Sequence, residues 1–163
     1  MDKSYIEDLA SEFQSALKYV SKKGLYGSLT LFQSFPNGCC TYASDLLAEY
    51  LMYNGIDRER IQLVNSESNS MGYTHCWLMI DEILFVDITA DQFNGKPYFQ
   101  QYEPIPQCCI VQQGTYLFEC FTNRKIRFSR SFGISSYGGD IPSKLQVVYD
   151  AAVQVIENWR QRR

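Results

Sequence analysis

Two apolar runs separated by only two acidic residues constrain the fold of this chain more than any other feature. The runs extend from Thr74 to Ile80 and from Ile83 to Ile88, and Asp81-Glu82 lies between them. Short runs rich in branched and aromatic side chains are typical of buried strands, and so short a connection joins antiparallel neighbours. The sequence therefore predicts a β-hairpin within a mainly antiparallel sheet.

Apolar residues at helical spacing predict three helices that pack on this sheet. The first helix is marked by apolar residues at steps of three and four, namely Ile6, Leu9, Phe13, Leu17 and Val20. The second runs from about Cys40 to Asn54, and the third begins near Pro142 or Ser143. Further strands are predicted at residues 61–64, 108–111 and 116–121. This order of elements indicates an α+β fold.

Composition narrows the classes of protein to which the chain can belong. A length of 163 residues fits one domain, which we expect to cover residues 1–163, and 45% hydrophobic residues against 20% charged residues argue against disorder. The net charge of −3, without a block of Lys and Arg, argues against nucleic acid or an anionic membrane surface as a partner. The sequence has no apolar run of about 20 residues and begins unlike a signal peptide, so we expect a cytoplasmic location.

The six cysteines are more informative by position than by number. Two adjacent pairs, Cys39-Cys40 and Cys108-Cys109, do not resemble a secreted disulfide framework. Zinc chelates usually place two to four residues between paired cysteines, and this sequence has no such pair. We therefore interpret most of the cysteines as small buried apolar residues.

Three residues stand apart as candidates for chemistry. Cys40 falls at a predicted helix start, where the helix dipole favours the thiolate. His75 is the only histidine, and Asp87 ends an apolar run where an unpaired carboxylate would cost several kcal/mol to bury. Each also has a plainer interpretation: a cysteine packed under a helix end, a histidine bonded to a carbonyl, and an aspartate bonded to a turn or helix amide.

The hairpin provides a test of this grouping. If Asp81-Glu82 alone formed the turn, strand alternation would place Asp87 on the face opposite His75. The two side chains share a face only if the connection has an odd number of residues or one strand carries a bulge. We therefore predict such an irregularity between Met79 and Leu84, and a regular two-residue turn would exclude Asp87 as the partner of His75.

The order of these motifs resembles the core of papain-like cysteine enzymes. The resemblance covers roughly residues 31–93, and its motifs are Phe35-Pro36-Asn37-Gly38-Cys39-Cys40, Ala43-Ser44, His75-Cys76-Trp77 and Asp87-Ile88-Thr89-Ala90-Asp91-Gln92-Phe93. The short gaps between Cys, His and Asp resemble the transglutaminase-like branch, which includes arylamine N-acetyltransferases. The pattern is also similar to small bacterial proteins that carry F-P-x-G-x-C and H-x-W followed by D-I-T-A-D-Q-F.

The resemblance implies a papain-like or transglutaminase-like core, with the nucleophile on a helix packed against the sheet. Cys40 would be the nucleophile, His75 the general base and acid, and Asp87 the residue that orients the imidazole. Cys39 is the rival nucleophile, because helix starts are uncertain by one residue. Three further residues complete the expected site: Gln33 as an oxyanion donor together with the backbone N–H of Cys40, Trp77 as a wall beside the histidine, and Gln92 at the cleft.

These groups permit acyl transfer through a thioester. Resolution by water would make the chain a protease, amidase or deamidase, and resolution by an amine would make it an acyltransferase; we favour hydrolysis of a protein, a peptide or a small amide. No metal or organic cofactor is implied. Two other classes remain open: an inactive protein-binding or immunity module on the same fold, and a metal site built from Cys39 or Cys40, Cys76, His75 and Asp87.

Overall fold

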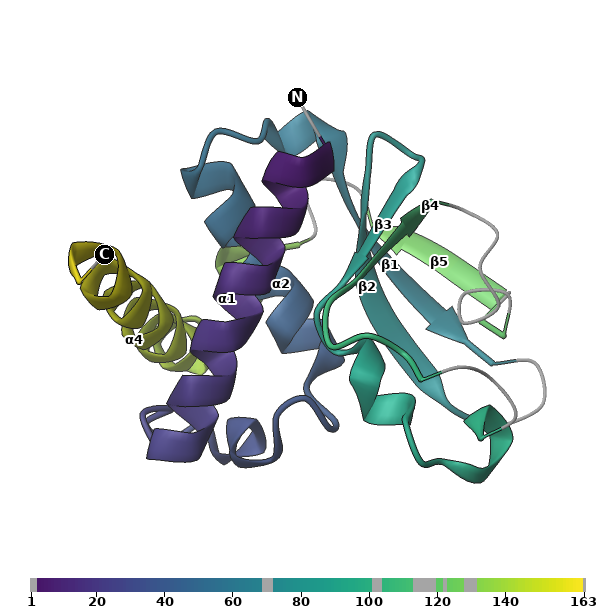
Figure 1. Ribbon diagram of the computed structural model, residues 1–163, viewed down its shortest axis with the longest axis horizontal. Coiled ribbons are helices and arrows are strands. Elements are labelled where there is room, and N and C mark those ends of the chain that lie inside the picture. The colour runs from purple at the N-terminus through teal and green to yellow at the C-terminus, as the bar shows by residue number, and fades with distance from the viewer. Residues whose placement is uncertain are drawn as a thin grey trace.

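The computed structural model describes residues 3–68, 72–100, 104–112, 120–121, 123–127 and 132–162 (Figure 1). Its helices are α1 (Lys3–Lys23), α2 (Cys40–Tyr53) and α4 (Ile141–Gln161). Its strands are β1 (Ile61–Glu67), β2 (Thr74–Ile80), β3 (Leu84–Asp87), β4 (Cys109–Gln112) and β5 (Asn123–Arg127). Short 3-10 helices η1 to η5 lie at Thr30–Ser34, Arg58–Arg60, Ala90–Phe93, Pro97–Phe99 and Ile134–Ser136.

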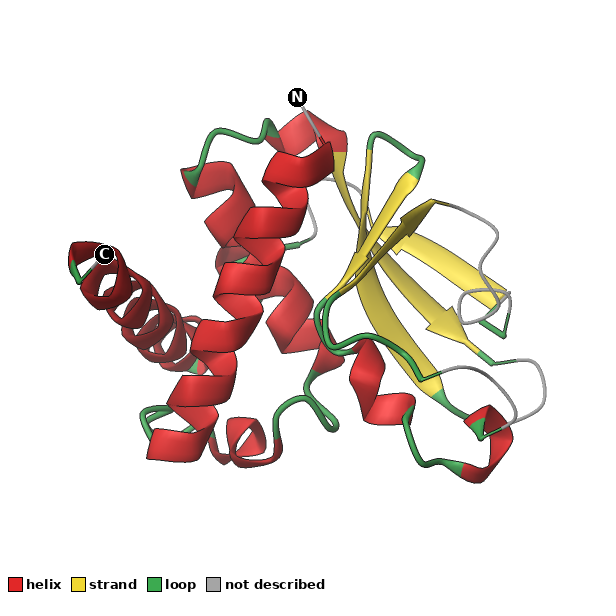
Figure 2. Ribbon diagram, in the orientation of Figure 1, coloured by secondary structure: helices red, strands yellow, loops and turns green. Residues whose placement is uncertain are grey.

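The described strands form one sheet with the order β4-β3-β2-β1-β5, and every pair of neighbours is antiparallel. The helices gather on one side of this sheet, with α1 between α4 and the strands in the view of Figure 2. The α+β class expected from the sequence is confirmed. The helix α2 contacts β2, so the element expected to carry the nucleophile lies against the middle of the sheet.

Both faces of the sheet are buried, which explains why its central strand is a continuous apolar run. Leu78 of β2 and Val86 of β3 belong to the core beneath the helices. Trp77 and Phe85 point to the other face, where they join a second apolar cluster with Phe93 of η3. His75 alternates with Trp77 and therefore lies on this second face, away from the helices.

The connection between β2 and β3 contains three residues, because Ile80 pairs with Leu84. Asp81 and Glu82 both have positive φ, at 52° and 61°, and the N–H of Ile83 donates to the carbonyl of Ile80. The predicted odd-length connection is thus confirmed, and it places Asp87 on the same face as His75. The simpler assignment of Asp81-Glu82 as the whole turn is excluded.

Several element boundaries differ from the sequence prediction. β1 continues to Glu67, beyond the predicted end at residue 64, because both of its edges are paired, one with β2 and the other with β5. The predicted strand at 108–111 is shifted by one residue, and the strand predicted at 116–121 lies almost entirely outside the described residues. β5 was not predicted. Among the described residues, no helix has the length and apolar character needed to cross a membrane.

Candidate active site

His75 and Asp87 form a buried pair at the ends of two neighbouring strands. Nε2 of His75 donates to Oδ2 of Asp87 across 2.5 Å, and each residue is only 1% exposed. A carboxylate withdrawn from water needs a partner of this kind, because an unpaired charge at this depth would cost several kcal/mol. The interpretation of Asp87 as a residue bonded only to a turn amide is therefore incomplete.

The second carboxylate oxygen of Asp87 is held by Thr89, a residue to which the sequence analysis gave no role. Oδ1 accepts hydrogen bonds from the backbone N–H of Thr89 at 2.9 Å and from its hydroxyl at 3.0 Å. An aspartate that accepts from the amide two residues later is a common turn pattern, so Asp-x-Thr was an available signal. Both oxygens are thus engaged, and the carboxylate is fixed in the orientation that meets the imidazole.

Aromatic rings enclose the imidazole of His75. The ring of Trp77 lies 5.6 Å from it and the ring of Phe93 lies 4.8 Å from it, edge to face, with Phe121 at 5.4 Å. Trp77 is fully buried, so its position beside the histidine agrees with the wall expected from the sequence. This apolar surround lowers the local dielectric and strengthens the interaction between His75 and Asp87.

Cys40 is the first residue of α2, and its thiol reaches the sheet where β3 has already ended. The β2–β3 ladder covers only residues 78–80 of β2, which leaves the peptide group of Cys76 outside it. The hydroxyl of Ser44, one turn after Cys40, donates to the Cys76 carbonyl at 3.3 Å. The sulfur of Cys40 accepts a hydrogen bond from the backbone N–H of Cys76. Two residues of α2 thus replace the missing strand at Cys76.

This docking brings the thiol of Cys40 against the imidazole of His75. Since Nε2 is bound to Asp87, Nδ1 is the ring nitrogen left for the thiol. The contact between the thiol and Nδ1 is looser than a fully aligned hydrogen bond. Nδ1 is buried and has no well-aligned hydrogen bond to any of the described residues. Contacts between a nucleophile and its base are often long or misaligned before substrate binds.

The electrostatics of this pair favour transfer of the thiol proton to the imidazole. Burial alone raises the pKa of Cys40, but the hydrogen bond and charge of His75, aided by the backbone of Cys76, outweigh it and lower this pKa below 9.0. Burial lowers the pKa of His75, and the charge and hydrogen bond of Asp87 overcome this effect and raise it to about 9. Both shifts act in the same direction, so the thiolate–imidazolium pair is favoured.

Cys39, the rival nucleophile, has a different environment. It is the residue that precedes the first turn of α2, it is 1% exposed, and its thiol donates to the carbonyl of Pro36 at 3.4 Å. Burial raises its pKa to about 12, which keeps the sulfur protonated. The geometry thus separates two adjacent cysteines: Cys40 contacts the histidine, and Cys39 fills the core.

None of the described contacts joins the thiol to two other expected site residues, Gln33 and Gln92. Gln33 lies exposed on η1, and its carbonyl accepts a hydrogen bond from Ser21 of α1 at 3.2 Å. Gln92 donates to the carbonyl of Thr89 at 2.9 Å, an interaction that orders the start of η3. The oxyanion role of Gln33 stays a prediction without a supporting contact, and Gln92 has the ordinary loop role.

Of the residues considered for a metal site, Cys40, His75 and Asp87 lie close together, but Cys39 and Cys76 belong to the core under the helices. In the parts of the chain that the structure describes, no three side chains of His, Cys, Asp and Glu are grouped so that they could hold a metal ion. Strand alternation explains this for Cys76, whose side chain belongs to the core under the helices while His75 points to the opposite face. The geometry therefore gives no support to the metal-binding alternative.

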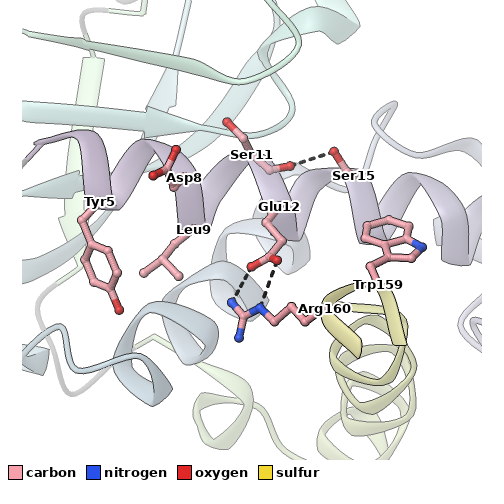
Figure 3. Close-up of a pocket in the computed structure, with 8 residues that line it drawn as sticks. All are labelled: Tyr5, Asp8, Leu9, Ser11, Glu12, Ser15, Trp159 and Arg160. Carbon is pink, nitrogen blue, oxygen red and sulfur yellow. Dashed lines mark hydrogen bonds and ion pairs between the residues drawn. The ribbon is translucent and has the colours of Figure 1, made fainter. Parts of the chain in front are cut away.

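A separate cavity of about 670 Å³ lies between α1 and α4 (Figure 3). Glu12 and Arg160 meet across it, with Oε2 and Nη2 separated by 2.6 Å, and Tyr50 donates to the same carboxylate at 2.9 Å. Its lining includes none of the candidate site residues. The polar groups of this cavity tie the two terminal helices together, and we assign it no chemistry.

Comparisons with known proteins do not identify the chain. No protein-family model, no curated protein and no solved structure matches it.

Proposed function

We propose that this chain is a cysteine-dependent acyl-transfer enzyme that hydrolyses an amide or peptide bond. The observation that carries the proposal is the chain of contacts from Cys40 through His75 to Asp87. One ring nitrogen of His75 faces a thiol of lowered pKa, and the other is bound to a buried carboxylate whose two oxygens both accept hydrogen bonds. A histidine with a purely structural role needs neither partner. Perturbed ionisable groups of this kind cluster at functional sites.

In the acylation step, the Cys40 thiolate attacks the carbonyl carbon of the substrate, and a carbon–sulfur bond forms. The carbon–nitrogen bond of the amide then breaks, and the imidazolium of His75 gives its proton to the departing amine. Asp87 holds the ring through Nε2, so that Nδ1 faces the reacting atoms. The products of this step are a thioester on Cys40 and a free amine.

In the second step, water resolves the thioester. The neutral imidazole of His75 removes a proton from the water, whose oxygen attacks the thioester carbonyl, and the carbon–sulfur bond breaks. Cys40 leaves as the thiolate and His75 is again an imidazolium. The substrate has gained one water molecule in total, so the cycle needs no external oxidant or reductant.

The start of α2 would stabilise the negative oxygen that develops on the carbonyl. The backbone N–H of Cys40 lies in the first helical turn, where amides lack partners within the helix, and Cys39 provides no side-chain cap. An N–H directed at the developing oxyanion is the common device in acyl-transfer enzymes. The same arrangement, a cysteine-bearing helix against an antiparallel sheet, supports a papain-like or transglutaminase-like core.

Site-resolved alkylation tests this proposal. The protein is treated with iodoacetamide over a range of pH, and mass spectrometry follows the adduct on each cysteine. We expect Cys40 to react faster than Cys39 and Cys108 below pH 7, and His75→Ala to remove this advantage. Slow, uniform labelling of all cysteines would favour an inactive binding module instead.

A further inference from the structure

A second cavity, of about 400 Å³, lies at the start of α2. Its lining comes from five parts of the fold: η1, the two residues that precede α2, the first turn of α2, β1 and the residue that follows η5. The lining residues are Leu31, Gly38, Cys39, Thr41, Tyr42, Asn65 and Tyr137. This cavity is distinct from the one between α1 and α4.

Two relations place this cavity next to the reactive thiol. Cys39 and Thr41, the residues on either side of Cys40 in the chain, both line the cavity, so the cavity adjoins the backbone that carries the nucleophile. Asn65 is the cross-strand partner of Cys76, whose peptide group holds the Cys40 thiol. Directly opposed residues in an antiparallel pair lie about 5 Å apart, so Asn65 brings one wall of the cavity near Cys76.

The described residues that line the cavity are uncharged. None of them is Asp, Glu, Lys, Arg or His, and burial keeps the thiol of Cys39 protonated. Leu31 and the rings of Tyr42 and Tyr137, whose centroids lie 5.3 Å apart, give an apolar surface. The amide of Asn65 and the hydroxyl of Thr41 add neutral polar groups. A charged ligand group would lose hydration here without gaining an ionic partner.

A buried aspartate fixes the position of Tyr137 in the wall of the cavity. Asp45 of α2 is fully buried, accepts a hydrogen bond from the hydroxyl of Tyr137, and accepts another from the N–H of Gly133 at 2.7 Å. The segment that carries Tyr137 is therefore anchored to the same helix as the nucleophile. A cavity formed before the ligand arrives avoids part of the ordering cost of binding.

We propose that this cavity binds an uncharged apolar or aromatic group of the substrate, attached next to the carbonyl that Cys40 attacks. The inference rests on the proposed function and narrows its substrates to neutral amides. A substrate with a carboxylate or an ammonium group at this position would be rejected.

Three alkylating probes with the same reactive carbon test the inference: chloroacetamide, N-benzyl-2-chloroacetamide and chloroacetate. The rate of Cys40 labelling by each probe is divided by its rate with glutathione, which removes differences in intrinsic reactivity. We expect the benzyl probe to exceed chloroacetamide by about 10-fold, the effect of a well-filled apolar pocket, and chloroacetate to fall below both.

Leu31 and Leu25 provide a matched pair of variants. Leu31 lines the cavity and is 42% exposed, whereas Leu25 is 43% exposed and does not line it. We expect Leu31→Asp to abolish the preference for the benzyl probe, because it places a charge in the neutral wall, and Leu25→Asp to leave the preference unchanged. If Leu31→Asp fails to fold, Asn65→Asp introduces the same charge from β1.

The possible outcomes separate this inference from the proposed function. Rapid labelling of Cys40 with equal normalised rates for all three probes would overturn the inference and leave the enzyme proposal intact. Equal loss of preference in both leucine variants would also overturn it. A Cys40 thiol no more reactive than the other cysteines toward chloroacetamide would overturn both.

Discussion

Nε2 of His75 and Oδ2 of Asp87 lie 2.5 Å apart on neighbouring strands because the connection between these strands has three residues. Side chains alternate along a strand, so a two-residue connection would have turned Asp87 to the helical face of the sheet. The left-handed conformations of Asp81 and Glu82 accommodate the additional residue. A detail of turn geometry thus determines whether the histidine has a carboxylate partner.

Substitution of Asp87 by asparagine is predicted to remove the negative charge beside His75 while preserving the shape of the side chain. The neutral amide does not raise the pKa of His75, so that pKa falls and the imidazolium form is weakened. We expect alkylation of Cys40 at pH 7 to slow markedly, because the same change of the orienting residue lowers kcat by about 10⁴-fold in the serine-protease triad. Asp81→Asn, at an exposed carboxylate paired with Arg60, serves as the control and should leave the rate unchanged.

The stability of the protein should depend on pH through His75. Its pKa is raised from 6.5 to about 9 in the folded state, so its stabilising contribution is complete below pH 6.5 and is lost as the pH rises through 9. Urea unfolding of the wild type and of His75→Gln at several pH values measures this contribution. The difference in free energy of unfolding should shrink from pH 6.5 to pH 9, and a constant difference would disagree with the assignment.

Thr89 is predicted to be a positioning residue that acts through Asp87. Thr89→Val removes the hydroxyl that donates to Oδ1 and keeps the backbone donor, so we expect a loss of about 1 to 2 kcal/mol in the free energy of unfolding. The pH at which Cys40 labelling reaches half its maximum should also shift, which a purely structural effect would not cause. Thr89→Ser restores the hydroxyl and should restore this pH profile.

The two adjacent cysteines should respond differently to substitution by alanine. Cys39→Ala removes a buried sulfur from the core and should cost about 1 kcal/mol of stability, while Cys40 keeps its rate of labelling. Cys40→Ala should eliminate the fast reaction below pH 7. Fast labelling of Cys39 in the Cys40→Ala variant would reverse the assignment of the nucleophile.

Local patterns in the sequence were sufficient to predict the elements that carry the site. The apolar spacing and the Asn37-Gly38 turn placed the start of the second helix at Cys40, where the structure has it. Strand alternation, applied to His75 and Asp87, predicted an odd-length connection or a bulge, and the structure has the odd-length connection. These predictions succeeded because helix starts and hairpin register depend on residues close together in the chain.

Features that depend on distant pairing were not predictable in the same way. β5 has the polar sequence Asn-Arg-Lys-Ile-Arg, and it forms a strand through its pairing with β1, far away in the chain. No pattern in the sequence predicts that α2 binds the backbone of Cys76. The oxyanion role of Gln33 was implied by the resemblance to papain-like enzymes, and the structure leaves that residue exposed on η1.

The presence of one histidine makes the central claim directly measurable. Nuclear magnetic resonance of the imidazole nitrogens reports the titration of His75 without overlap from another ring, and Cys40→Ser isolates the contribution of the thiolate. We predict that His75 stays protonated above pH 6.5 and titrates near pH 9, with a lower value in Cys40→Ser. Titration at or below pH 6.5, unchanged by Cys40→Ser, would contradict the existence of a thiolate–imidazolium pair.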